Sequence, residues 1–118
     1  MKNPFKKLAA LCVTAYAKKI YNQAVSVAEG RYKEHPDMYY VITDPSDAKK
    51  LMCINTRQFL EMRKFFKVPG RSLPINGLKE GCWYHTKSKT GKDALSFRDL
   101  TVRKLAFCRE LLLRAKLA

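Results

Sequence analysis

The chain has 118 residues, which is enough for one modest hydrophobic core and too short for two domains of ordinary size. A hydrophobic content of 47% argues against wholesale disorder, whereas 24 Lys and Arg against 10 Asp and Glu give a formal net charge of +14. This excess is spread along the whole chain instead of forming a basic tail. We therefore expect an anionic partner, which could be nucleic acid, an acidic protein surface or a membrane face.

Pro4 to about Ala28 has the pattern of a long helix, which we expect Gly30 to end. The helix has one apolar stripe and further apolar residues on a neighbouring face. Its apolar surface is therefore wider than one small sheet can cover. The stripe contains Phe5, Ala9, Cys12, Val13, Tyr16, Ile20 and Val27, and Leu8, Leu11 and Ala15 extend it. We expect no signal peptide here because Lys18 and Lys19 close the apolar run early, and no stretch approaches the roughly 20 apolar residues of a membrane span.

Residues 38–43 and 50–54 are short runs of β-branched, aromatic and aliphatic side chains with a turn sequence, Asp44–Asp47, between them. This pattern predicts a β-hairpin over 38–54. Asn55 and Thr56 can then cap a helix that presents Phe59, Met62 and Phe66 on one face. The region thus reads as a strand, turn, strand and helix.

Residues 68–77 contain two prolines and two glycines, so we predict a loop. We expect a third strand over 82–86, a basic turn over 87–92 and a short fourth strand at Ala94 and Leu95. The predicted fold class is α+β: a small antiparallel sheet, made of the hairpin 38–54 and the strand 82–86, flanked by long N- and C-terminal helices. Residues 1–118 form a single basic domain in this interpretation.

Ser96 and Asp99 fit a capping box that starts a C-terminal helix running to about Lys116. Its broad apolar arc should face the core and contains Phe97, Leu100, Leu105, Cys108, Leu111, Leu112 and Ala115. A second stripe, consisting of Val102, Ala106, Leu113 and Leu117, lies on another side. A helix that packs once needs one stripe, so we predict that these four residues bind a partner, either the N-terminal helix or another chain.

Cys82 and His85 have a metal-ligand spacing that Cys53 and His35 could complete, but on a strand the first two side chains point to opposite faces. We therefore expect no metal, and all four cysteines, Cys12 and Cys108 included, to be reduced packing residues. Nothing in the sequence forms a nucleophile pair, a phosphate loop or a paired acid and base. We expect no catalytic residue, cofactor or small-molecule substrate, so the protein is predicted not to be an enzyme.

Two sets of side chains could instead contact nucleic acid or an acidic surface. The predicted basic contacts are Lys87, Lys89 and Lys92 on the turn and Arg57, Arg63 and Lys64 on the helix after the hairpin. Simple solvation of these charges is the alternative. The strand aromatics, Tyr39, Tyr40, Trp83 and Tyr84, either stack nucleic-acid bases or fill a thin core, and we favour the core.

Three features together carry a family resemblance: the Met1-Lys2-Asn3-Pro4-Phe5-Lys6-Lys7 start, the Tyr-Tyr-Val-Ile-Thr-Asp-Pro hairpin of residues 39–45 and the basic helical end. With these the chain resembles the small accessory virion proteins of tailed bacteriophages, including those of crAss-like phages. The resemblance implies a structural protein of the capsid or portal vertex, assembled in the host cytoplasm among other chains of the particle. It assigns no site residue. A nucleic-acid-binding protein of the ribosomal or DNA-packaging kind is the alternative.

Overall fold

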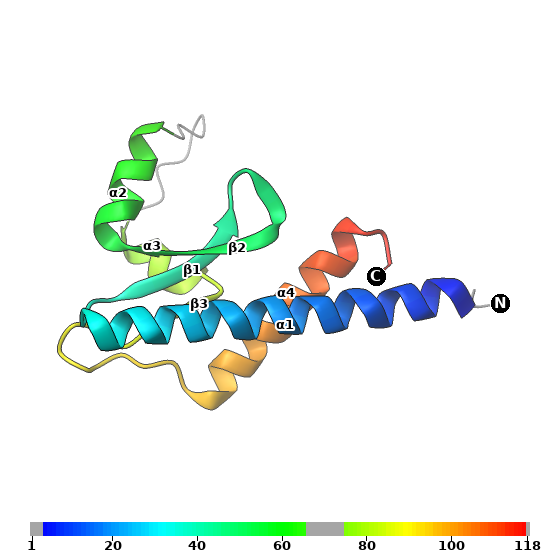
Figure 1. Ribbon diagram of the computed structural model, residues 1–118, viewed down its shortest axis with the longest axis horizontal. Helices are drawn as coiled ribbons and strands as arrows, with labels where there is room; N and C mark the ends of the chain where they lie inside the picture. The colour runs from blue at the N-terminus through cyan, green and yellow to red at the C-terminus, as the bar shows by residue number, and fades with distance from the viewer. Residues whose placement is uncertain (1–3, 66–74, 118) are drawn as a thin grey trace.

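The computed structural model describes residues 4–65 and 75–117, with side chains for 4–62 and 78–117. In these ranges a three-stranded antiparallel sheet lies between helices on both of its faces (Figure 1). Helices α1 (Pro4–Glu34) and α4 (Phe97–Arg114) cover one face, and α2 (Thr56–Phe65) and α3 (Ile75–Gly81) cover the other. The fold is therefore α+β, with long terminal helices flanking a small sheet as predicted.

The sheet has the order β2-β1-β3, in which β1 (Tyr39–Asp44) pairs with β2 (Asp47–Asn55) and with β3 (Tyr84–His85). In the β1–β2 turn the Asp44 carboxylate accepts hydrogen bonds from the Ser46 hydroxyl and backbone N–H, which hold the pKa of Asp44 below its ordinary value. The hairpin prediction is thus confirmed, with β2 beginning earlier than expected.

The third strand is shorter than predicted over 82–86. The backbone bends at Cys82 and Trp83, where the Cys82 N–H still bonds the Leu78 carbonyl and closes α3. The predicted fourth strand at Ala94 and Leu95 is wrong, because both residues lie in an irregular segment that leads to α4. Along one of its two edges, β1 therefore pairs with a strand of only two residues.

Side chains of the hairpin alternate between two cores, as a pleated strand requires. The core under α1 and α4 receives Tyr39 and Val41, whereas the core under α2 and α3 receives Tyr40 and Ile54. Tyr39, Tyr40 and Tyr84 are all buried, in agreement with the expectation that these aromatics fill the interior. The interior is thicker than the thin core we expected, because apolar side chains cover both faces of the sheet.

The face of α1 that reaches the core is only partly the predicted stripe: Val13 and Ile20 pack against the core, whereas Tyr16 and Val27 are exposed. Ala17, Tyr21 and Ala28 are fully buried, and two of these three are alanines. Small side chains let the sheet and α4 approach the helix backbone closely, and α4 fills the space with Phe107, whose ring lies 6.2 Å from that of Tyr21. Phe107 belonged to neither predicted stripe of α4, yet it is fully buried.

Helix α1 continues through Gly30, where we predicted its end. Two tertiary hydrogen bonds hold the extra turn: the Arg31 guanidinium donates to the Cys53 carbonyl at 2.8 Å, and the Tyr32 hydroxyl donates to the Ser88 carbonyl at 3.0 Å. Gly30 does not adopt the left-handed conformation that would make glycine necessary there. The glycine therefore weakens the helix locally without ending it.

Both predicted helix starts are confirmed. The Asp99 N–H donates to the Ser96 side chain, and Asn55 and Gln58 exchange side chain to backbone hydrogen bonds of 2.8 and 3.0 Å. In contrast, residues 75–77 belong to α3 instead of the predicted loop. Residues 68–74 of that loop and Phe66 lie outside the described residues.

Candidate docking surfaces and the cavity beside His85

The second stripe of α4 faces away from the core. Val102 is 58% exposed and Leu113 is 53% exposed, Ala106 is exposed as well, and Leu117 lies half-buried beyond the end of the helix. The opposite side of α4 carries the buried Phe107 and its neighbours. Within the described chain, α1 therefore packs on the other side of α4 and leaves this stripe uncovered.

Three residues of the predicted core arc of α4 are also exposed, which corrects that prediction. Phe97 is 86% exposed, Leu105 is 55% exposed, and Ala115 at the end of the helix is exposed as well. Phe97 opens the helix before α4 reaches α1, and Leu105 lies at the border between the core face and the Val102 stripe. The outer surface of α4 is thus more apolar than periodicity alone indicated.

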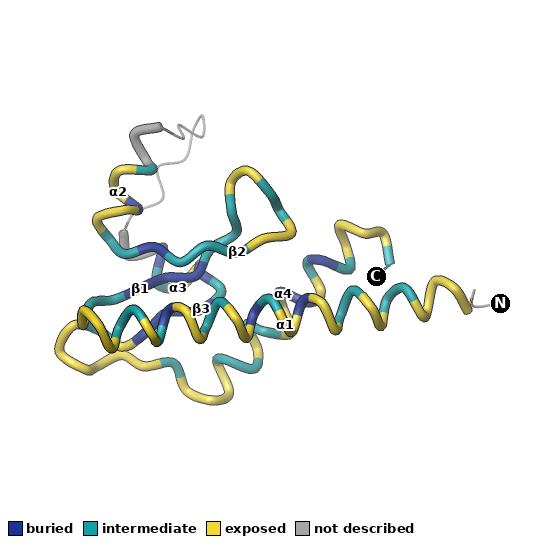
Figure 2. Tube along the Cα trace, in the orientation of Figure 1, coloured by how far each residue is buried: buried dark blue, intermediate teal, exposed yellow. Residues whose placement is uncertain are grey.

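Helix α1 also carries exposed apolar side chains. Its first turns extend beyond the sheet, and the buried stretches of the helix lie beside the sheet and where α4 crosses it (Figures 1 and 2). The exposed large apolar side chains of α1 are Phe5, Leu8, Leu11, Tyr16 and Val27. Cys12 is exposed among them, so the expectation that it packs in the core is wrong.

Two hollows follow α1 on one of its sides. The first, about 400 Å³, lies between α1, α4 and the β2 residue Lys49, and the second, about 440 Å³, lies between α1 and β2. Tyr16 lines both, so the hollows adjoin. Their combined lining is Cys12, Val13, Tyr16, Lys19, Ile20, Gln23, Ala24, Val27, Lys49, Lys50, Leu51, Leu111, Arg114 and Ala115. We call this surface the α1 groove.

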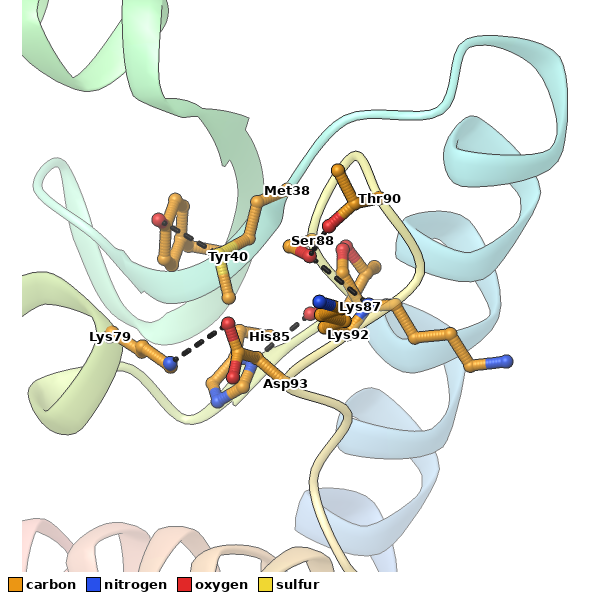
Figure 3. Close-up of polar contacts among 10 residues, drawn as sticks. Met38, Tyr40, Lys79, His85, Lys87, Ser88, Thr90, Lys92 and Asp93 are labelled. Atoms are coloured by element: carbon orange, nitrogen blue, oxygen red, sulfur yellow. Dashed lines mark hydrogen bonds and ion pairs between the residues drawn. The ribbon is translucent and has the colours of Figure 1, made fainter.

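The basic turn after β3 is well defined by its backbone. The Ser88 N–H donates to the Lys92 carbonyl at 2.6 Å, and Gly91 takes a positive φ of 82° that closes the turn. Lys87, Lys89 and Lys92 are all exposed on it, and Figure 3 shows Lys87 and Lys92 on the loop. The hydrogen bond from the Tyr32 hydroxyl to the Ser88 carbonyl fixes the turn to the end of α1. The structure therefore presents the three predicted lysines from one anchored loop.

The other predicted basic residues belong to α2, and the structure describes the side chain of only one of them. Arg57 has an exposed side chain that lies 3.7 Å from Glu61 in an ion pair along α2. Arg63 and Lys64 belong to α2, but their side chains lie outside the described ones. Lys89 instead lines a hollow with Arg31 and other residues at the end of α1.

A cleft of about 560 Å³ opens beside the buried His85. Lys79 and Asp93 form an ion pair of 3.5 Å next to the imidazole (Figure 3), and Arg103 donates to the carbonyls of Lys79 and Cys82 at 3.2 and 2.7 Å. The cleft also contains the carboxylates of Glu80 and Asp99. Its charges are mixed in sign, and Arg103 is engaged in holding the end of α3.

Burial lowers the pKa of His85, and the positive charges of Arg103 and Lys79 act in the same direction, while a hydrogen bond to the Thr86 carbonyl opposes them. The neutral ring with its proton on Nδ1 can donate to that carbonyl at 3.0 Å. Thr86 itself is fully buried: its hydroxyl accepts from the Tyr39 N–H and lies within hydrogen-bond distance of the Asp37 and Lys87 carbonyls. This network ties β3 to the start of β1.

The cysteines are all free, and Cys82 does not meet His35 or Cys53 in a common site. Burial raises the thiol pKa of Cys53, Cys82 and Cys108. Among the described residues, no three His, Cys, Asp or Glu side chains are placed to hold a metal ion. None of the described helices combines the length and apolarity that crossing a bilayer requires.

The sequence alone does not indicate the groove, because its basic residues Lys19, Lys49 and Lys50 come from two elements that are far apart in the chain. In the sequence, Lys19 marks only the end of an apolar run. The available signal was the predicted α1 stripe itself, whose Val13, Tyr16, Ile20 and Val27 all line the groove, although Val13 and Ile20 also pack against the core.

Comparison with known proteins identifies no relative: no protein-family model matches the chain, and no curated protein or solved structure is significantly similar to it.

Proposed function

We propose that the protein is a non-enzymatic structural component of a large assembly, and that it docks through the apolar outer faces of its terminal helices. The observation that carries this proposal is the exposure of Val102 and Leu113 on α4, at 58% and 53%, together with a second exposed apolar surface on α1. Exposed apolar side chains gathered on helix faces are typical of protein contacts. The tailed-phage virion is the assembly that the resemblance of the sequence suggests.

The charge of the chain supports docking among other molecules over self-association. A net charge of +14 on a 13.6 kDa chain repels a second copy and attracts acidic surfaces. In a virion, such surfaces are offered by acidic protein faces and by packaged nucleic acid. The exposed apolar faces would supply the contact, and the charge would supply orientation and speed of association.

The double variant Val102→Asp with Leu113→Asp tests this function. Both side chains are exposed, so the variant should keep the circular-dichroism spectrum and unfolding midpoint of the wild type. In cells that carry the assembly, the tagged wild-type chain should sediment with large particles and the variant should remain with small proteins. Thr101→Val on the same helix is the control. A correctly folded variant that still sediments with the particles would refute docking through this stripe.

A second candidate function is nucleic-acid binding through the basic turn. The specific observation is that Lys87, Lys89 and Lys92 project from one loop whose backbone is fixed by hydrogen bonds. Three phosphate contacts predict that affinity for DNA falls by about 40-fold when salt rises from about 50 to about 200 mM. Replacing all three lysines by alanine should remove that salt dependence. Sedimentation that resists both salt and nuclease would instead favour protein docking.

A further inference from the structure

The α1 groove combines an apolar floor with a basic rim. Val13, Ile20 and Ala24 of α1 line it together with Leu51 of β2 and Leu111 of α4. The exposed basic residues along it are Lys19, Lys49, Lys50 and Arg114, of which Arg114 also pairs with Glu110 at 3.1 Å. In the described chain, the three lysines form no ion pair and no carboxylate lines the groove. A ligand there would meet apolar surface flanked by positive charge.

The groove has the dimensions and spacing of a helix-binding site. Its lining runs along α1 from Cys12 to Val27, fifteen residues apart, which is about 22 Å at a helical rise of about 1.5 Å per residue. The α1 residues on it recur at steps of three and four, as Val13, Tyr16, Ile20, Ala24 and Val27. Ridges at this spacing pack against the side chains of a second helix. Figure 1 shows the end of the β1–β2 hairpin and the last turns of α4 on the same side of α1, and residues of β2 and of the end of α4 line the groove.

From this geometry we infer that the α1 groove binds an acidic amphipathic helix of a partner protein. The inference rests on the docking function proposed above and gives its partner a chemistry: an apolar stripe at helical spacing, with Asp or Glu along its borders. A second copy of this chain does not fit, because its own basic residues would oppose the basic rim. Nucleic acid fits the rim but not the apolar floor, since a phosphate backbone leaves such side chains uncovered.

Cys12 reports directly on whether the groove is filled. It lines the groove and is exposed, whereas burial raises the pKa of the other three thiols and lowers their reactivity. The probe is a synthetic peptide of about 15 residues with Leu at positions i, i+3, i+4 and i+7 and Glu along the borders. At about ten times its measured Kd, it should slow modification of Cys12 in the intact protein by about tenfold.

Three control ligands decide what the groove recognises. A peptide of the same composition in scrambled order keeps the charge and loses the apolar stripe, and a peptide with Lys in place of Glu keeps the stripe and reverses the charge. The third ligand is a single-stranded oligonucleotide of about the same net charge. None of the three should protect Cys12. Protection by any of them equal to that of the Glu peptide would overturn the proposal.

Lys→Glu substitutions distinguish the effect of the basic rim on peptide binding from the effect of the net charge of the protein. The double variant Lys19→Glu with Lys50→Glu should lower the affinity for the Glu peptide by about tenfold and allow the Lys peptide to bind. Lys87→Glu with Lys89→Glu changes the net charge equally but lies on the basic turn outside the groove, so affinity should stay within about twofold. Circular dichroism checks both folds. Equal loss in the two variants would overturn the groove as the binding site.

The outcomes distinguish this inference from the docking function. If the Glu peptide fails while Val102→Asp with Leu113→Asp still abolishes sedimentation with particles, the groove proposal is wrong and docking through α4 stands. If that α4 variant sediments normally while the Glu peptide protects Cys12, the groove is a binding site and docking through the α4 stripe is wrong.

Discussion

Two stretches of α1 belong to different parts of the molecule. The stretch from Ala17 to Ala28 buries Ala17, Tyr21 and Ala28 completely, whereas the first turns of the helix carry Leu8 and Leu11 at 60% and 62% exposure. Beside the sheet, polar groups are also satisfied, since no buried side-chain nitrogen or oxygen in the described residues lacks a hydrogen-bond partner. One helix thus serves the stability of the fold at one end and presents apolar surface at the other.

Helix α4 is likewise divided into a buried and an exposed apolar part. The largest predicted change in unfolding free energy tests this division there. Phe107→Ala removes a fully buried ring that lies 5.4 Å from Trp83 and should cost about 3–5 kcal/mol of unfolding free energy. Phe97→Ala removes the same ring from a position that is 86% exposed and should change stability by less than about 0.5 kcal/mol. Chemical denaturation measures both. Similar losses in the two variants would contradict the division.

A medium effect tests the hydrogen-bond network beside the sheet. Thr86→Val keeps the shape of a fully buried side chain but leaves the Tyr39 N–H without its acceptor, so it should cost about 1–3 kcal/mol. Thr101→Val is the matched control, because its hydroxyl bonds only the carbonyl one turn earlier in α4. We expect the control to lie within about 0.5 kcal/mol of the wild type in urea unfolding. Equal behaviour of the two variants would show that Thr86 is not structurally important.

A smaller effect of opposite sign concerns Gly30. A methyl group at this helical position meets no atom within 4 Å, so Gly30→Ala should stabilise the protein by about 0.5–1 kcal/mol. Gly91→Ala also meets no atom, but its φ of 82° strains alanine and should destabilise by about 1 kcal/mol. Thermal unfolding reports both signs. A destabilised Gly30→Ala would mean that α1 does end near this residue.

The last predicted effect is a change in the pH dependence of stability. Burial keeps the pKa of His85 below its ordinary value of 6.5, so the unfolded chain takes up a proton at a higher pH than the folded one. Stability should be constant above the ordinary pKa and fall as pH drops from there towards the lowered pKa. His85→Asn, which can still donate to the Thr86 carbonyl, should flatten this slope in urea midpoints measured between about pH 7.5 and pH 5. An unchanged slope would remove His85 as its cause.

Local signals in the sequence predicted the elements that depend on local chemistry. The Ser96 cap, the exchange between Asn55 and Gln58 and the Asp44 turn all form within a few residues, so their sequence patterns were sufficient. The end of α1 depended on tertiary bonds from Arg31 and Tyr32 to distant carbonyls, which no local pattern contains. Gly30 therefore gave a misleading signal.

Hydrophobic periodicity could not predict which face of α1 is buried, and the reason is a different one. Helix α1 is apolar over more than one face, and hydrophobic spacing cannot select between two apolar faces. Packing selected the face with Ala17 and Ala28 because the backbone can approach the sheet most closely there. Tyr16 and Val27 of the predicted stripe remained exposed and line the groove, while Val13 and Ile20 pack against the core. The candidate docking residues on α4 were predictable as a stripe, but their exposure required the structure.

The sheet order gives β2 a further importance, because it makes this nine-residue strand an edge. The strand contains the apolar run Leu51-Met52-Cys53-Ile54, and an edge strand of this kind can pair with a copy of itself, although here the Arg31 guanidinium already bonds the Cys53 carbonyl. Lys49 and Lys50 precede that run and are exposed, so stacking identical strands would bring like charges within about 5 Å of each other. The two lysines at the rim of the α1 groove would therefore oppose edge-to-edge pairing between two copies of the free chain.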